Sequence, residues 1–263
     1  MKIFILNALI RLGSFVRENL EGLGHAARTF VAVLARSGAL IKRPRLVLDQ
    51  IFFLGNYSFV IIAISGLFVG FVLGLQGYNT LNRYGSEQAL GLLVALSLTR
   101  ELGPVVTALL FAGRAGTSLT AEIGLMKAGE QLAAMEMMAV DPLARVLAPR
   151  LWAGIIAMPL LAAIFSAVGI IGGYLVGVPL IEVDEGAFWA QMQGGVDVIQ
   201  DVGNGVLKSV VFGIAVTFIA VYQGYQSKPT PEGVSLATTR TVVISSLAVL
   251  ALDFLLTAVM FSN

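Results

Sequence analysis

Charged residues divide this chain into long apolar stretches separated by shorter polar segments. No charged residue occurs between Asp49 and Arg83. Within that interval, Tyr57 to Leu75 is long and apolar enough to cross the hydrocarbon core of a bilayer, about 30 Å thick. Four similar stretches follow along the chain. The pattern predicts five membrane-spanning helices, centred on 57–75, 88–113, 151–181, 208–225 and 241–261.

The N-terminal region, 1–48, has a different pattern. From Asn7 to Arg28, polar residues recur at alternating steps of four and three, and apolar residues occupy the other positions. This spacing places the polar side chains on one stripe of a helix. Residues 1–45 also hold eight of the 17 basic residues. We expect an amphipathic helix lying in the membrane interface, although the same pattern also suits a helix packed on other protein.

The composition agrees with an integral membrane protein, because 57% of the residues are hydrophobic and 13% charged, against about 45–50% and 25% in soluble domains. The chain has no cysteine and a single histidine, His25, which excludes disulfides, thiol catalysis and a histidine-rich metal site. The phosphate-binding pattern G-x-x-x-x-G-K-[S/T] is absent, so a partner or an ion gradient must supply energy for any uphill transport. We expect an all-α integral membrane protein with one domain over 1–263, comprising an interfacial region (1–48) and a transmembrane domain (50–263), and no catalytic residue or metal ligand.

The connections between the predicted spans carry charge asymmetrically. Connections 114–150 and 226–240 contain arginine and lysine, whereas 182–207 is acidic. Basic connections remain in the cytoplasm. The N-terminus is therefore expected inside the cell and, after five crossings, the C-terminus outside.

Four ionisable residues lie within the predicted spans: Arg100, Glu101, Lys208 and Asp253. Lys208 is expected near the outer end of its span, and the others lie deeper. Charges at such depth need a partner or water. We expect a shared polar cavity in which Arg100 or Lys208 would bind the phosphate of a lipid headgroup. The alternative is a set of internal salt bridges that only holds the helices together.

A glycine pattern in the first span concerns helix packing. Gly66, Gly70 and Gly74 recur every four residues, on one face of a helix. Such small-residue faces let another helix approach closely. The alternative is that they reflect a general enrichment of glycine in the chain.

The segment 127–142 contains helix formers and several methionines, and it ends at Asp141-Pro142. It predicts a short cytosolic helix on which Leu132, Met135, Met138 and Ala139 share a face. A methionine-rich face adapts well to a partner's groove. The alternative is a helix that packs on the chain's own spans.

A set of motifs, spread from about residue 50 to the C-terminus, resembles the MlaE/YrbE family of ABC transporter permeases, which serve Mla phospholipid transport with MCE proteins. Each motif alone is weak, but their order and spacing together are specific. They are Leu98-Thr-Arg-Glu-Leu-Gly-Pro-Val-Val-Thr107, Ala112-Gly-Arg114, Ala121-Glu-Ile-Gly124, Met126-Lys127, Glu130-Gln131, Asp141-Pro142, Pro149-Arg150, Tyr222-Gln-Gly224, Ala237-Thr-Thr-Arg240 and Asp253.

The resemblance implies a multi-pass permease of the bacterial inner membrane that acts as a homodimer. Its partners would be a cytosolic ABC ATPase, which binds the ATP and Mg, a small STAS-domain protein and a periplasmic hexamer of MCE-domain subunits. The cargo would be phospholipid exchanged between inner and outer membranes, which maintains outer-membrane lipid asymmetry. No cofactor in this chain and no nucleic acid are implied.

The resemblance also implies roles for particular residues. Arg100 and Glu101 would face a lipid cavity at the dimer interface, near which the glycine face would pack. The mouth of that cavity would be lined by Leu73, Gln76, Leu81 and Tyr84. A coupling helix over about 125–141 would seat in the ATPase through Glu130, Gln131, Met135, Glu136, Met138 and Asp141.

The chain departs from the family pattern at two places. Ala139 precedes Val-Asp-Pro where the family has glycine, and Lys228-Pro-Thr-Pro231 replaces a glycine-rich segment. Two other functions remain open from the residues alone. An ion-coupled secondary transporter or channel would use the buried charges, but the chain lacks the internal repeat common in such folds. A membrane-embedded lipid enzyme would need a base or metal set that these residues do not supply.

Overall fold

The computed structural model describes the backbone of residues 2–261 and the side chains of residues 17, 20–38, 40 and 43–260. Within this range, every regular element is a helix. Five helical stretches are long and apolar enough to cross a membrane: Pro44–Asn82, Glu87–Ala128, Leu143–Gly177, Val198–Gln226 and Pro231–Met260. The prediction of an all-α membrane protein with five spans is confirmed.

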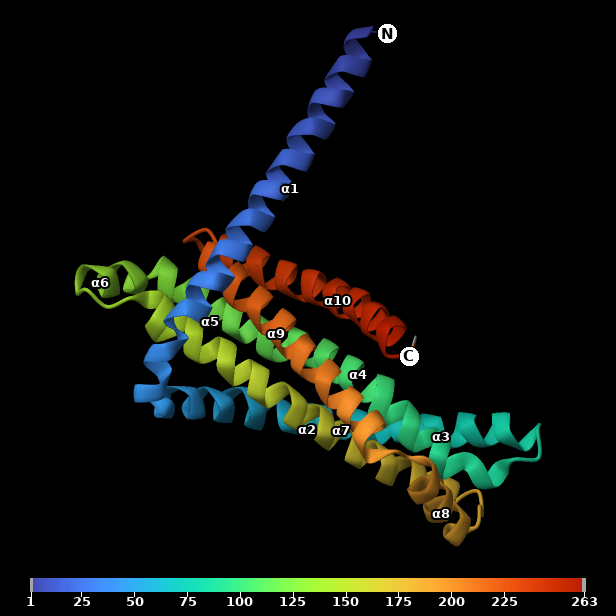
Figure 1. Cartoon of the computed structure of the whole chain (residues 1–263). Coiled ribbons are helices and arrows are strands. Elements are labelled where there is room, and N and C mark those ends of the chain that lie inside the picture. Colours follow the sequence, from blue (N-terminus) through green and yellow to red (C-terminus); the bar gives the residue numbers. More distant parts are fainter. Residues whose placement is uncertain (1, 262–263) are drawn as a thin grey trace.

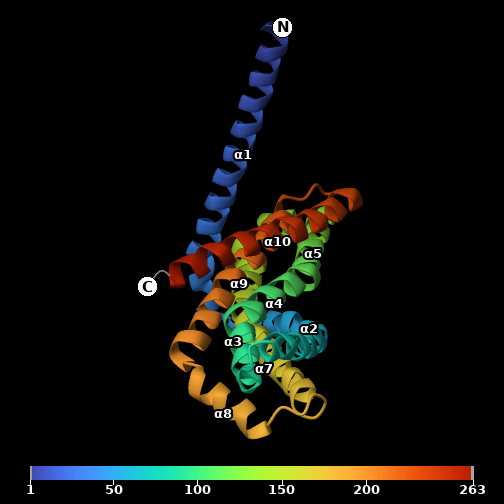
Figure 2. The same cartoon turned by 90° about the vertical axis from the view of Figure 1, so that its right-hand side faces the viewer.

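The N-terminal helix α1 (Lys2–Arg36) is continuous, and its first half extends away from the other helices (Figure 1, Figure 2). Its second half packs against the membrane-spanning helices, where the rings of Phe30 and Phe218 meet edge to face with centroids 4.9 Å apart. A 3-10 turn, η1 (Ser37–Lys42), follows. Pro44 then opens the first span at a position where its missing N–H leaves no helical bond unmade. The position of α1 in the membrane interface stays a prediction.

The first and third spans, α2 (Pro44–Asn82) and α7 (Ala148–Gly177), pack closely along each other. The glycine face of α2 lies against the backbone of α7: Gly66 against Phe165, Gly70 against Gly169 and Gly74 against Gly173. A Cβ at Gly70 would overlap the carbonyl group of Gly169. The glycine face therefore packs within the chain, and its nearness to a dimer interface stays a prediction.

The second span contains two π-helical turns, η3 and η4. One cause is Pro104, which has no N–H to donate and so removes one bond of the α-helical ladder. Beside it, the N–H of Gly103 bonds to the carbonyl of Leu98, five residues back. Such turns are frequent at functional sites. In order, the span comprises η2 (Glu87–Ala89), α3 (Leu90–Ser97), η3 (Leu98–Leu102), α4 (Gly103–Phe111), η4 (Ala112–Gly116) and α5 (Thr117–Ala128).

Short elements connect the spans at opposite ends of the bundle, with α6 at one end and α8 at the other (Figure 1). At the first end lie α6 (Gln131–Met137) and η5 (Leu143–Leu147); at the second lie α8 (Glu185–Gly195) and η6 (Val198–Val202), which leads into α9 (Gly203–Gln226).

The prediction started the fourth span near Lys208, but the span begins ten residues earlier, at Val198. The Asp197 side chain accepts the N–H groups of Ile199 (2.8 Å) and Gln200 (3.1 Å). It thereby caps the helix within the acidic segment that the prediction assigned to a loop. Lys208 consequently lies inside the span.

The last span, α10 (Pro231–Phe261), packs on α9 and α5 along one side of the bundle (Figure 2). Only 11% of its most apolar window is buried in the single chain, against 28–50% for the other spans. Leu247, Phe254 and Val259 are among its exposed apolar side chains. This face is available to lipid or to another chain.

Candidate functional site

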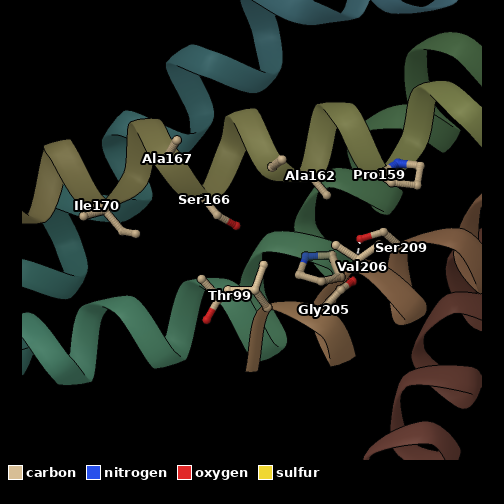
Figure 3. Close-up of a pocket in the computed structure, with 12 residues that line it drawn as sticks. Thr99, Pro159, Ala162, Ser166, Ala167, Ile170, Gly205, Val206 and Ser209 are labelled. Atoms are coloured by element: carbon tan, nitrogen blue, oxygen red, sulfur yellow. Dashed lines mark hydrogen bonds between the residues drawn. The ribbon is translucent and has the colours of Figure 1, made fainter. Parts of the chain in front are cut away.

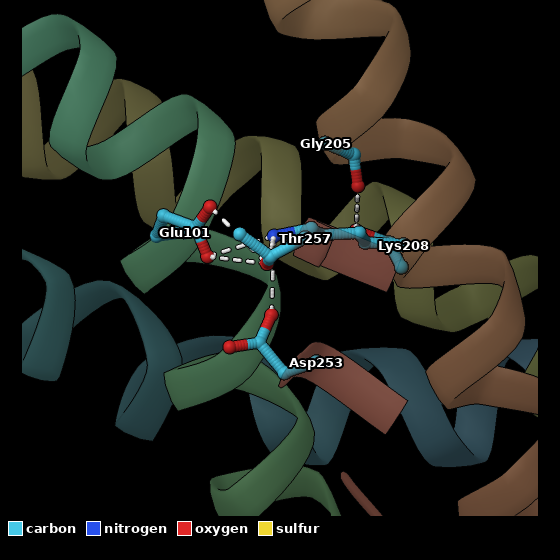
Figure 4. Close-up of polar contacts among 6 residues, drawn as sticks. Glu101, Gly205, Lys208, Asp253 and Thr257 are labelled. Atoms are coloured by element: carbon cyan, nitrogen blue, oxygen red, sulfur yellow. Dashed lines mark hydrogen bonds and ion pairs between the residues drawn. The ribbon is translucent and has the colours of Figure 1, made fainter. Parts of the chain in front are cut away.

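Lys208 is at the centre of a cluster of polar side chains inside the membrane-spanning region (Figure 4). Its side chain is 2% exposed. The ammonium Nζ donates to Glu101 Oε2 at 2.7 Å, to Asp253 Oδ1 at 3.1 Å and to Thr257 Oγ1 at 2.7 Å. An ammonium has three donors, so these acceptors satisfy it fully. The Lys208 side chain on α9 therefore links η3 and α10 to that helix.

Arg100 forms a second ion pair beside the first. Its Nε donates to Asp201 Oδ1 at 2.6 Å, and its Nη2 also contacts that oxygen. The Asp201 side chain is 2% exposed, whereas that of Arg100 is 33% exposed. The other carboxylate oxygen of Asp201 accepts the N–H of Asp197 at 2.8 Å. The carboxylate is thus held inside the protein, and the guanidinium lies at the surface of a cavity.

Two π-helical turns, η3 of the second span and η6 at the start of the fourth, bring these ion pairs together. Arg100 and Glu101 are consecutive residues of η3, and Asp201 lies in η6. α9 approaches η3 closely, because a Cβ at Gly205 would overlap the carbonyl of Thr99. Glycine at that position therefore allows the acidic start of the fourth span to reach Arg100.

A polar cavity of about 210 Å³ opens onto the ion pairs, and its lining includes Arg100, Glu101, Gln200, Asp201, Asn204 and Lys208. With Asp253, the cluster contains two cations and three carboxylates. The four charges predicted to meet belong to two separate groups. Lys208 pairs with both Glu101 and Asp253, whereas Arg100 pairs with Asp201, which was not among the four. Whether the cavity binds a headgroup stays a prediction.

An apolar cavity, also of about 210 Å³, lies between α7 and the contact of η3 with α9 (Figure 3). Its lining includes Thr99, Pro104, Pro159, Ser166, Val202 and Val206. The start of the fourth span, from the end of η6 into α9, thus separates two environments. Asn204 and Lys208 line the polar cavity, and Val202 and Val206 line the apolar one. The arrangement suits an amphiphile better than a simple ion.

The four residues predicted to line the cavity mouth lie at the C-terminal end of α2 and in the turn after it. Leu73 and Leu81 are half-buried against the main core. Gln76 and Tyr84 are exposed, Tyr84 to 80%. Their role at a cavity mouth stays a prediction.

The expected coupling helix is shorter than predicted. Glu130 adopts a left-handed conformation (φ 58°) and ends the continuity with α5, and Ala139 (φ 59°) ends α6 after Met137. The prediction of one helix over 125–141 is therefore wrong. The predicted face is also split, because Leu132 is 6% exposed whereas Met138 is 67% exposed.

The exposed surface of α6 contains the predicted coupling residues Gln131 and Glu136. It also contains Met137, which is 84% exposed. Met135 packs partly against a core cluster, and Asp141 forms an ion pair with Arg36 of α1. The docking role of these residues stays a prediction.

Two polar partners in the cluster escaped the sequence prediction. Asp201 was assigned to the outer acidic loop, and Thr257 was not considered. Helical spacing contains the signal for both. Asp201 precedes Lys208 by seven residues, two helical turns, and Thr257 follows Asp253 by four, so each pair shares a helix face.

Comparison with known proteins identifies one matching family and several relatives. The family model described as Permease MlaE matches residues 47–259. The chain is 56% identical over 257 residues to the intermembrane phospholipid transport system permease protein MlaE of Haemophilus influenzae, which covers 98% of each chain. It is 36% identical to a probable ABC transporter permease protein of Rickettsia typhi, over 98% and 99% of the two chains. It is 28% identical to the chloroplastic protein TRIGALACTOSYLDIACYLGLYCEROL 1 of Arabidopsis thaliana, over 83% and 62%.

Proposed function

Because this chain belongs to the MlaE permease family, we propose that it is the membrane-spanning permease of an ABC transporter that moves phospholipids between the inner and outer membranes. The proposal places the chain in the inner membrane as a multi-pass subunit, with the N-terminus in the cytoplasm and the C-terminus in the periplasm. Its physiological result would be the maintenance of outer-membrane lipid asymmetry.

The observation that carries the proposal within this chain is the ionic cluster in the membrane-spanning helices. Arg100 is one-third exposed at the polar cavity, so a lipid phosphate can reach its guanidinium, which matches phosphate geometry. Lys208 is buried and fully coordinated, so it positions Glu101 and α10 rather than contacting lipid. The apolar cavity beside η3 would hold part of an acyl chain.

The working unit in this proposal is a homodimer. The exposed apolar face of α10 gives one chain a surface that a second copy can cover. Asp253 and Thr257 belong to the same helix and face Lys208. Association along α10 would therefore bring the ionic clusters of the two chains toward a common lipid cavity.

Energy in this proposal comes from a cytosolic ATPase that binds ATP and Mg. The chain has no phosphate-binding loop, and its relatives include probable ABC transporter permeases. The exposed tip of α6, with Glu136 and Met137, is the proposed docking surface for the ATPase. The STAS-domain protein and the periplasmic MCE-domain hexamer complete the proposed assembly.

The proposal is tested by reconstituting the full chain with its ATPase in liposomes and measuring transfer of a fluorescent phospholipid. We expect transfer to require ATP and to fall about tenfold in Arg100→Gln, the loss of one charge-assisted bond. The double variant Arg100→Gln/Asp201→Asn removes both charges and should remain folded but inactive. Arg83→Gln, in the outer turn, is the matched control.

Two results would overturn the proposal. If the double variant regained wild-type transfer, the cluster would serve only to hold the helices together. If the isolated chain moved lipid with an ion gradient and no ATPase, the protein would be an ion-coupled transporter.

A further inference from the structure

Arg114 is a partly buried cation whose charge no described carboxylate neutralises. It lies in η4, the second π-helical turn of the second span. Among the other cations within the spans that are at least half-buried, Arg100, Arg150 and Lys208 each form an ion pair with a carboxylate. Lys127 instead donates to the carbonyl oxygen of Tyr225 at 2.7 Å. Among the side chains that the structure describes, Arg114 has only neutral partners.

All of those neutral contacts are made by one nitrogen of the guanidinium, Nη1. Nη1 contacts the carbonyl oxygens of Phe53 (3.5 Å) and Leu54 (3.4 Å) and the hydroxyl of Ser58 (3.3 Å). All three distances are long for a hydrogen bond. Nε and Nη2, which carry three of the five N–H donors, make no hydrogen bond to a described residue. The guanidinium therefore retains directional donors for an anion.

Aromatic rings hold the guanidinium in a defined orientation. Its Cζ lies 5.6 Å from the ring centroid of Phe53 and 5.1 Å from that of Tyr57. Stacking on aromatic rings is favourable for arginine and leaves the N–H edges of the fork available. The neighbouring Gly113 is exposed, and a Cβ there would meet no heavy atom within 4 Å. The surface beside Arg114 has room for a ligand group.

The limits of the predicted spans, 57–75 and 88–113, place Arg114 at the level of lipid headgroups. Its contacts on α2 lie at 53–58, where the apolar stretch of the first span begins. Tyr57 is 61% exposed there, and tyrosine is typical of the boundary between hydrocarbon and headgroups. Arg114 follows Arg100 by fourteen residues, about 21 Å along a helix. The two arginines therefore serve different sites.

We propose that Arg114, with Tyr57 beside it, binds the phosphate of a membrane phospholipid beside the N-terminal half of α2, separately from the ionic cluster at Lys208. The phosphodiester supplies the missing negative charge, and Nε and Nη2 bind two of its oxygens as a fork. This inference needs only that the chain spans a bilayer and does not rest on the proposed transport function. The site is a fixed lipid contact that orients α2 and η4 in the bilayer.

Native mass spectrometry of the full chain tests the site. The wild type, Arg114→Gln and the matched control Arg83→Gln are each incubated with phosphatidylglycerol or with diacylglycerol, which lacks the phosphate. We expect Arg114→Gln to retain phosphatidylglycerol about tenfold less than the wild type and the control, as for loss of a charge-assisted bond. Diacylglycerol retention should be equal in all three. Excess inorganic phosphate should not displace the lipid; if it did, the site would bind free phosphate, and the lipid assignment would be wrong.

A second measurement uses only the wild type, in case Arg114→Gln fails to fold. Single-particle imaging of the wild-type chain in phosphatidylglycerol nanodiscs should show phosphate density within about 4 Å of the Arg114 guanidinium, the reach of an ion pair. The inference would be overturned if the density at that position showed acyl chains or water but no phosphate. So would a carboxylate of a second chain, which would make Arg114 an interface residue, or equal phosphatidylglycerol retention in Arg114→Gln.

Discussion

The ammonium of Lys208 lies 2.7 Å from a carboxylate oxygen of Glu101, although 107 residues separate them in the chain. Their contact joins the fourth span to the π-helical turn of the second. Asp253 and Thr257 extend the same contact to the fifth span. One buried side chain thus sets the relative positions of three membrane helices.

Lys208→Met is expected to lower stability because it leaves the carboxylates of Glu101 and Asp253 without a cation. Breaking a fully buried pair costs about 3–5 kcal/mol. Glu101 and Asp253 retain 35% and 23% exposure, so we expect a loss of about 2 kcal/mol. Thermal unfolding of the purified chain in detergent measures it. The triple variant Lys208→Met/Glu101→Gln/Asp253→Asn should regain most of the stability, and a single variant as stable as the wild type would contradict the account.

Gly70→Ala is expected to destabilise the packing of α2 on α7, because its Cβ would overlap the backbone of Gly169. Overpacking of this kind costs about 1–3 kcal/mol, and backbone cannot move aside as a side chain can. The matched control is Gly55→Ala in the same helix, where a Cβ meets nothing within 4 Å. That change should raise stability by about 0.5–1 kcal/mol. Equal unfolding temperatures for the two variants would argue against the close contact.

Ala139→Gly is expected to stabilise the chain. Ala139 has φ 59°, and the left-handed region costs a non-glycine residue about 1–2 kcal/mol. Glycine loses about 0.4–1 kcal/mol through its greater freedom in the unfolded chain, which leaves a net gain of about 0.5–1 kcal/mol. Ala133→Gly, inside α6, should instead lose about 0.5–1 kcal/mol. Denaturant or thermal unfolding distinguishes the two signs, and destabilisation by both changes would refute the prediction.

Met137→Glu is expected to weaken binding of the partner ATPase about tenfold, typical of an exposed interface anchor. Because Met137 is 84% exposed, the substitution should leave the fold intact. Ile199→Glu is the matched control: Ile199 is 85% exposed and lies at the end of the bundle opposite α6. Affinity of each detergent-solubilised variant for the ATPase provides the measurement. Unchanged affinity for Met137→Glu would exclude the tip of α6 as the docking surface.

The candidate site was only partly predictable from local pattern. Glu101, Lys208 and Asp253 stood out because charges are rare in apolar spans, and the structure brings them into contact. Asp201 did not, because an acidic residue beside a loop resembles ordinary solvent-exposed charge. Its burial depends on Gly205, which lets η6 approach η3 until Arg100 can reach the carboxylate. That approach is a tertiary contact.

Local structure near α6 was also misjudged for a physical reason. The residues of 125–141 favour helix individually, but Glu130 and Ala139 adopt left-handed conformations that end it. Neither residue type predicts such a conformation, since alanine and glutamate are good helix formers. The turn is imposed by the need to reverse direction between α5 and η5.

Hydropathy and charge along the chain were sufficient to determine the helical class and the five spans, because backbone polar groups in lipid must be satisfied within each helix. Which side chains pair with one another was determined only by the tertiary structure. Three features depend on contacts between segments far apart in the chain: which helix meets the face of Gly70, which carboxylate neutralises Arg100, and the neutral surroundings of Arg114. Those contacts follow from close packing of whole helices, whose relative rotation and depth no single segment specifies.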